Sequence, residues 1–201
     1  IRETDLLILT IAEQGEINNF FRLNMKKFNK TIFTNFTFYV IFFRHLFNVL
    51  KPDKKILIVL FSGGGSTSYR KNFSSYSLSK LCLVKLTEIL NFEINNKKIR
   101  FNIISPGIID SKMTRVILRN KSKISSNELK KIRKNIKYSD QNLTKIYNTI
   151  NFLLSQKGKL ISGKMISSSW DNIDKFNKNK IKYLIKSDLY TLRRKENFEK
   201  L

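Results

Sequence analysis

"KKILIVLFSGGGSTSYRKNFSSYSLSK" (residues 54–80) is the stretch of sequence that decides the fold. It opens with a continuous apolar run at 56–61, which is typical of a strand buried on both faces of a parallel sheet. A glycine-rich loop follows, and apolar residues then recur at helical spacing from about Ser75 to Asn95. The stretch therefore predicts a strand, a loop and a helix, which together begin a βαβ unit.

The same alternation of strand and helix continues on both sides of this stretch. We expect strands at 5–12, 54–62, 98–105 and 163–168, helices at 25–50, 75–95 and 142–155, and polar surface helices within 111–138. This order predicts an α/β domain whose parallel sheet is covered on both faces. We expect the domain to occupy residues 1–172 and a basic C-terminal extension to occupy 173–201.

The bulk composition limits the classes of partner. The chain has 201 residues and a formal net charge of +24, which raises nucleic acid or an anionic membrane as partners. However, the lysines are spread along the whole chain, and the abundance of Lys, Asn, Ile and Phe is typical of an A/T-rich coding sequence. We therefore do not expect nucleic-acid binding. The aromatic run from Thr31 to Phe43 is too short to span a bilayer, so we do not expect a membrane span either.

Single copies of two residue types exclude several kinds of site. Cys82 is the only cysteine and His45 the only histidine, so the sequence offers no disulfide framework, no cysteine-based zinc site and no histidine pair. His45 sits in an apolar helical run and is interpreted as structural. We expect no metal site and a soluble, reducing, cytoplasmic setting.

Three polar residues lie where a parallel sheet places its chemistry, beyond the carboxyl ends of its strands. Ser62 closes the strand, and Tyr76 and Lys80 stand one helical turn apart on the same face of the next helix. An ammonium beside a phenol favours the phenolate, so we expect a lowered pKa for Tyr76. Tyr-x-x-x-Lys alone is a weak motif that a solvated helix turn also explains. Its combination with a serine at a strand end favours an acid–base site.

Four segments resemble the short-chain dehydrogenases/reductases in that family's order: "IVLFSGGGSTSYRKNFSSYSLSK", "IRFNIISPGIIDSKM", "FNKTIFTNFTFYV" and "ISGKMISSSWD". The resemblance spans roughly residues 5–172 and implies a Rossmann-like doubly wound parallel sheet. It implies that Tyr76 is the general acid/base, that Lys80 lowers its pKa and holds the nicotinamide ribose, and that Ser62 polarises the substrate oxygen. Asn35 would anchor a water that links Lys80 to solvent.

The resemblance also implies NAD or NADP as cofactor and a small carbonyl or secondary alcohol as substrate. Pro106, Gly107, Ile109 and Ser111 would line the nicotinamide site together with Tyr76 and Lys80. The family pairs helices across a two-fold axis, so we expect a homodimer or homotetramer. The interface would use the outer face of the 75–95 helix, at Leu83, Leu86, Leu90 and Ile94.

Two departures from the family pattern keep a second reading open. No G-x-G-x-x-G turn occurs in the chain, and Leu9-Thr10-Ile11-Ala12 stands where the family writes Asn-Asn-Ala-Gly. We therefore expect an N-terminally truncated sheet that by itself lacks useful affinity for the dinucleotide and lacks turnover. The alternative function is a degenerate or truncated relative that serves as a structural or interaction subunit.

Overall fold

The computed structural model describes residues 5–50, 53–94 and 98–193, and within these ranges four strands form one parallel sheet. The strands lie side by side in sequence order: β1 (Leu6–Leu9), β2 (Ile56–Phe61), β3 (Ile99–Ser105) and β4 (Lys164–Ser167). Leu57 of β2 is paired with Leu6 on one side and Arg100 on the other. The parallel α/β sheet expected from the sequence is confirmed, and β1 is shorter than the 5–12 strand predicted.

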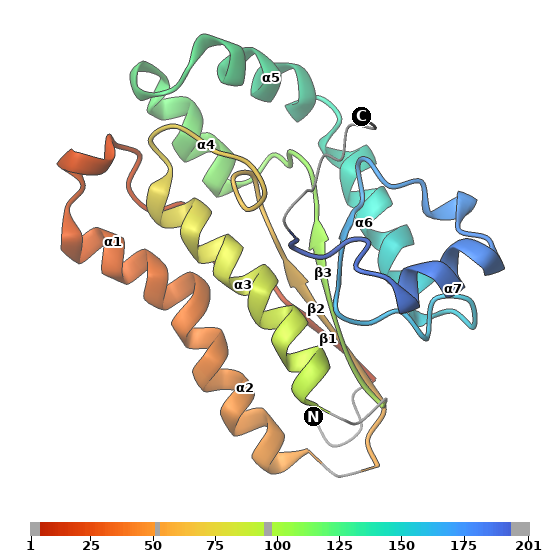
Figure 1. Ribbon diagram of the computed structural model, residues 1–201. Coiled ribbons are helices and arrows are strands. Elements are labelled where there is room, and N and C mark those ends of the chain that lie inside the picture. The colour runs from red at the N-terminus through yellow and green to blue at the C-terminus, as the bar shows by residue number, and fades with distance from the viewer. Residues whose placement is uncertain (1–4, 51–52, 95–97, 194–201) are drawn as a thin grey trace, which may run out of the picture.

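Helices link the strands, and each connection is long enough for the crossover that parallel pairing requires. Their bounds are α1 (Met25–Ile32), the π-helix η2 (Phe33–Thr37), α2 (Phe38–Val49), α3 (Ser74–Glu93), α4 (Lys112–Arg119), α5 (Ser126–Ile136), α6 (Ser139–Leu154) and α7 (Lys178–Lys186), with short 3-10 turns η1 (Phe20–Arg22), η3 (Lys121–Lys123) and η4 (Ile173–Lys175). Figure 1 shows α1, α2 and α3 on one side of the sheet and α6 and α7 on the other.

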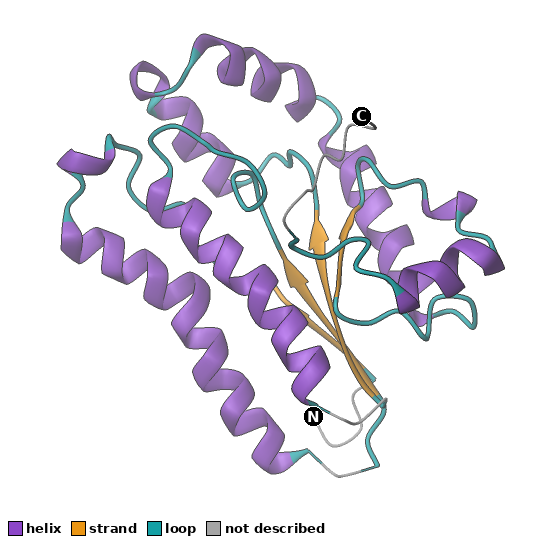
Figure 2. Ribbon diagram, viewed as in Figure 1, coloured by secondary structure: helices purple, strands orange, loops and turns teal. Residues whose placement is uncertain are grey.

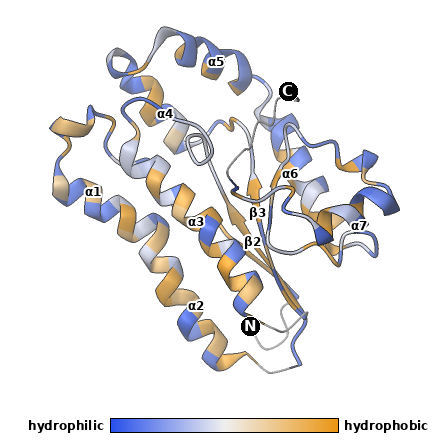
Figure 3. Ribbon diagram, viewed as in Figure 1, coloured by the Kyte–Doolittle hydropathy of each residue, from blue (hydrophilic) through white to orange (hydrophobic). Residues whose placement is uncertain are grey.

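The sheet is buried because β2 is apolar toward both layers of helices. Ile58 faces a core that it shares with Phe43 of α2 and Leu83 of α3, whereas Leu57 faces a core shared with Leu153 of α6. All of these side chains are almost fully buried. The hydropathy colouring in Figure 3 accordingly places the apolar strands between the helix layers. Strand alternation therefore fixes which residues face each layer.

The face of α3 predicted to form an interface instead packs inward. Leu83 is fully buried, and Leu86, Leu90 and Ile94 pack against the core on the α2 side of the sheet. The prediction that these four residues form an outer face is wrong, because α3 shares one core with the sheet and α2 and so buries a wider stripe than one sheet face requires.

The segment 173–193 packs against the sheet rather than away from it. Leu184 of α7 is fully buried in the same core as Leu57 and Leu153. The Met165 backbone N–H of β4 donates to the Tyr190 carbonyl at 2.9 Å. One hydrogen-bonding position at this edge of the sheet is thus occupied by the chain itself.

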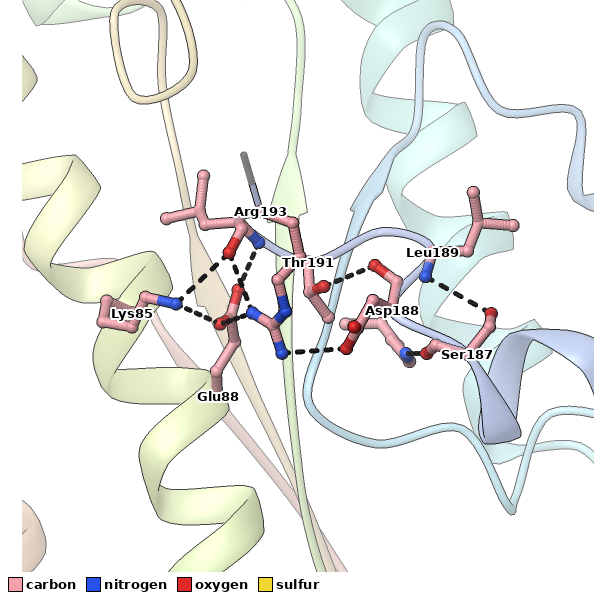
Figure 4. Close-up of polar contacts among 9 residues, drawn as sticks. Lys85, Glu88, Ser187, Asp188, Leu189, Thr191 and Arg193 are labelled. Atoms are coloured by element: carbon pink, nitrogen blue, oxygen red, sulfur yellow. Dashed lines mark hydrogen bonds and ion pairs between the residues drawn. The ribbon is translucent and has the colours of Figure 1, made fainter. Parts of the chain in front are cut away.

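A group of ion pairs then joins the segment to α3 (Figure 4). Glu88 accepts from the Leu192 backbone N–H at 2.6 Å and from Arg193 at 3.0 Å, and Lys85 lies beside the same carboxylate. Arg193 also pairs with Asp188 at 2.9 Å. Glu88 therefore joins residues 192 and 193 to the helix that carries Tyr76 and Lys80.

We predict that Leu184→Ala lowers the free energy of unfolding by about 2–5 kcal/mol, because it removes a fully buried side chain from the core. Tyr183→Ala, at the neighbouring exposed position, should change it by less than about 0.5 kcal/mol. Urea denaturation followed by circular dichroism measures both. Equal, small effects would mean that α7 contributes little to the folded domain.

Candidate active site

Lys80 anchors α3 to the carboxyl end of β2. Its Nζ donates a hydrogen bond to the carbonyl oxygen of Phe61 at 2.9 Å, and only 3% of the residue is exposed. Phe61 is the last residue of β2, so this bond holds the first turns of α3 beside Ser62. Burial lowers the pKa of Lys80 to about 8, because an ammonium loses its water there.

The phenol of Tyr76 points at the loop that follows Ser62. A Cβ atom at Gly63 would lie 2.2 Å from the Tyr76 hydroxyl oxygen, so any side chain at that position would displace the phenol. The glycine after Ser62 is therefore what lets Tyr76 approach the end of β2. Figure 2 shows this loop at the end of the sheet where the strands stop.

The electrostatics of Tyr76 differ from the prediction. Burial raises its pKa, and the charge that acts in the opposite direction is Arg70, not Lys80. The Lys80 ammonium lies 5.9 Å from the centre of the Tyr76 ring. The expectation that Lys80 brings the pKa of Tyr76 toward neutrality is wrong for this structure, because desolvation of the phenolate outweighs the nearby charge.

Ser62 is buried at the carboxyl end of β2, as predicted, with 3% of its surface exposed. Its backbone N–H donates to the Ile104 carbonyl at 2.9 Å, which continues the ladder between β2 and β3. Its hydroxyl shares a hydrogen bond of 2.8 Å with the Ser66 hydroxyl. Ser66 was not predicted, although its place four residues after Ser62 in the same loop could have indicated it.

Asn35 lies in the π-helix η2, fully buried, where it ties three segments together. Its amide group accepts from the Glu13 backbone N–H at 2.8 Å and donates to the Glu13 carbonyl at 2.9 Å. It also donates to the Ser79 hydroxyl at 3.0 Å, and Ser79 in turn donates to the Tyr76 carbonyl. Asn35 therefore supports the helical turn that carries Tyr76 and Lys80, and π-helical turns recur at functional sites. Its role in holding a water stays a prediction.

The turn after β3 holds the residues predicted to line the cofactor. Gly107 has φ +76°, and a Cβ there would lie 2.3 Å from the Ser169 hydroxyl, so the turn packs closely on the loop after β4. Ser111 accepts from the Thr114 backbone N–H at 3.3 Å and caps α4, while the Ile109 carbonyl accepts from the Thr114 hydroxyl. Pro106 and these residues follow the carboxyl end of β3, next to the end of β2 that carries Ser62. Their contacts with a dinucleotide stay predictions.

The donors present fit one end of a nicotinamide dinucleotide. Lys80 and Tyr76 offer an ammonium and a phenol, which suit the hydroxyl groups of a ribose. The pyrophosphate would need backbone N–H groups at the start of a helix in a glycine-rich turn. In the ranges that the structure describes, β1 is followed by a ten-residue loop, Thr10–Asn19, with a single glycine, Gly15. The fit therefore concerns the nicotinamide and its ribose.

Comparison with known proteins agrees with this geometry. Residues 1–169 match the family model described as "Enoyl-(Acyl carrier protein) reductase". The chain belongs to the short-chain dehydrogenase/reductase family of oxidoreductases. "Dehydrogenase/reductase SDR family member 4" of Homo sapiens and of Pongo abelii are each 29% identical to it over 110 residues, covering 54% of this chain and 38% of the relative. The match thus spans well under half the length of these relatives.

Solved structures share the fold. A "4-hydroxyisoleucine dehydrogenase mutant complexed with NADH and succinate" has a TM-score of 0.63 at 24% identity and covers 81% of this chain and 65% of its own. The aldohexose dehydrogenase of Thermoplasma acidophilum has a TM-score of 0.64 at 18% identity, with the same coverage of 81% and 65%. At these identities the likeness establishes the Rossmann-type fold. No described helix is long and apolar enough to cross a membrane.

We predict that the buried ammonium of Lys80 makes stability rise with pH. Below about pH 8 the lysine is charged in both the folded and unfolded states, so its desolvation penalty is constant. Between about 8 and the ordinary value of 10.5, the folded protein has lost the proton that the unfolded chain still binds, and stability rises. Relative to Lys80→Met, the wild type should gain on the order of 3 kcal/mol over that interval.

Urea unfolding of both proteins across this pH interval measures the effect. Lys131→Met, which changes an exposed lysine of α5, is the matched control and should follow the wild type. A constant difference between wild type and Lys80→Met would mean that Lys80 is not desolvated.

Proposed function

We propose that this chain forms the catalytic part of an NAD(P)-dependent oxidoreductase acting on a carbonyl compound or a secondary alcohol. Tyr76 is the general acid/base, Ser62 holds the substrate oxygen, and Lys80 binds the nicotinamide ribose. The observation that carries the proposal is the convergence of these groups at the end of β2: Lys80 on the Phe61 carbonyl, and Tyr76 against the residue after Ser62.

The protein's part in the reaction is to place one oxygen and move one proton. A bound nicotinamide dinucleotide supplies or takes the hydride. When a carbonyl is reduced, Tyr76 donates its phenolic proton to the oxygen that becomes an alcohol; in the reverse direction the phenolate accepts it. The raised pKa of Tyr76 keeps the phenol protonated, which suits the reduction direction. The Ser62 hydroxyl donates to the same oxygen and fixes its position.

The positioning of these groups supports catalysis over a purely structural role. The buried amide of Asn35 makes three hydrogen bonds. One of them joins it to Ser79, the residue before Lys80. An interaction subunit would not need a buried ammonium, which costs free energy that a leucine or methionine would not. The degenerate-relative alternative is favoured by Leu9-Thr10-Ile11-Ala12, which departs from the family pattern at the end of β1.

Self-association of the chain as a dimer or tetramer stays a prediction, now carried by other residues. Leu81, Ile89 and Phe92 of α3 are exposed, and Phe92 is 89% exposed. They replace the inward-facing leucines as the apolar part of the proposed interface. A cytoplasmic setting, as expected from the sequence, is part of the same proposal.

We predict that, in a chain extended upstream by a pyrophosphate-binding βαβ unit, Tyr76→Phe lowers turnover by at least about 100-fold and leaves the dissociation constant of NADH within about twofold, because the lost hydroxyl serves the proton. Absorbance of the nicotinamide with a panel of ketones and secondary alcohols measures turnover, and calorimetry measures binding with NADH and NADPH. Tyr69→Phe, fully exposed in the same loop, should behave as wild type. Turnover retained by Tyr76→Phe would contradict the assignment. A folded, extended chain that neither binds the cofactor nor turns over would favour the structural subunit.

A further inference from the structure

The loop between β2 and α3 carries a charged residue that the proposed chemistry does not use. The guanidinium of Arg70 stacks on the ring of Phe73, 3.6 Å from its centre, and Phe73 is almost fully buried. A Cβ at Gly64 would also lie 3.8 Å from the guanidinium. The plane of Arg70 is therefore held within the loop that begins at Ser62 and ends at the start of α3.

Arg70 is paired with a carboxylate 58 residues away, on α5. Its Nε donates to Glu128 Oε1 at 2.6 Å, and its Nη2 lies at 2.6 Å from the same oxygen. The side chains are 15% and 23% exposed, so both charges are largely removed from water. Removal of either partner would leave a charge with little water around it, so breaking this pair costs more than breaking one on the open surface.

Several cationic residues lie nearer to Glu128 in the sequence than Arg70 does. It is the only acidic residue between Ser111 and Tyr138, a segment that holds ten lysines and arginines. Lys131 lies three residues further along the same helix, at a spacing where ion pairs form readily. The hydrophilic outer turns of α5 are visible in Figure 3. The one carboxylate of this segment nevertheless turns inward to Arg70.

Two further contacts join the same segment to the same loop. Asn72, which has φ +68°, donates from its side chain to the Lys123 carbonyl at 2.6 Å. Phe73 shares a small apolar core with Ile117 of α4 and Ile132 of α5. Residues 111–138, here called the cap, lie beyond the carboxyl ends of the strands in Figure 1. The cap therefore rests on the loop that positions Ser62 and leads into Tyr76.

We propose that Arg70 is a positioning residue: its ion pair with Glu128 clasps the cap over the Ser62–Tyr76 loop and so controls access of the substrate to the phenol. This inference rests on the proposed function. This pair, the Asn72 hydrogen bond and a small apolar core join the cap to the loop, and local opening of such a contact region admits substrate. The same guanidinium is the charge that lowers the pKa of Tyr76 against the effect of burial, which places it within electrostatic reach of the reacting hydroxyl.

Hydrogen–deuterium exchange tests the clasp without any assay of activity. Glu128→Gln and Arg70→Gln should each speed exchange of the α5 amides about tenfold and leave the β2 amides unchanged, because only the cap loosens. The reversed pair, Arg70→Glu with Glu128→Arg, should restore slow exchange. Arg115→Gln, which breaks the exposed Arg115–Asp110 pair on α4, is the matched control and should not change exchange of α5. Wild-type exchange in Glu128→Gln would overturn the proposal.

Steady-state kinetics test the consequence for the substrate. In Glu128→Gln the substrate KM should rise at least about fivefold while kcat stays within about twofold, and the reversed pair should recover the wild-type KM. An unchanged KM beside faster exchange would overturn the control of access. These kinetics are measured in the chain extended upstream by a pyrophosphate-binding βαβ unit. If that extended chain shows no turnover, the proposed function fails, whereas the exchange data still decide whether the clasp exists.

Discussion

A single hydrogen bond inside the protein, from the Lys80 ammonium to the Phe61 carbonyl, determines where the site lies. It joins the helix that carries Tyr76 to the last residue of the central strand that precedes Ser62. The bond is costly, since burial takes the ammonium out of water and depresses its pKa. The surrounding structure must therefore supply the free energy that holds it in place. The two cores on either face of β2, which bury Ile58 and Leu57, are the source of that free energy.

Asn35 also holds α3 in place, by joining it to the loop after β1. The π-helix η2 places its amide between Glu13, beyond the end of β1, and Ser79 on α3. A buried amide is tolerated only when its donors and acceptor are paired, and here three partners satisfy it. The loops after β1 and β2 and the start of α3 are thus held in one arrangement, which is what an acid–base group needs to meet a substrate oxygen repeatedly in the same position.

Much of this arrangement could be predicted from the sequence because it depends on local patterns. The apolar run at 56–61, the serine that closes it and Tyr-x-x-x-Lys on one helix face are each visible in a few consecutive residues. The burial of Leu83 could not be predicted, since helical spacing does not say whether α2 covers a second face of α3. The pKa of Tyr76 depends on burial by distant segments. The Arg70–Glu128 pair joins residues 58 positions apart, and no sequence pattern indicates it.

Binding of NADH to the end of β2 can be measured directly through Trp170, the only tryptophan in the chain. Trp170 is exposed and follows Ser169, which packs against Gly107 in the turn after β3. The decisive measurement is a titration of tryptophan fluorescence with NADH in the chain extended upstream by a pyrophosphate-binding βαβ unit, with Lys80 intact and as Lys80→Met. If Lys80 holds the ribose, quenching should saturate in the extended chain that keeps Lys80, and the dissociation constant should rise at least about tenfold in the variant. Equal dissociation constants in the two proteins would contradict the placement of the nicotinamide beside Lys80.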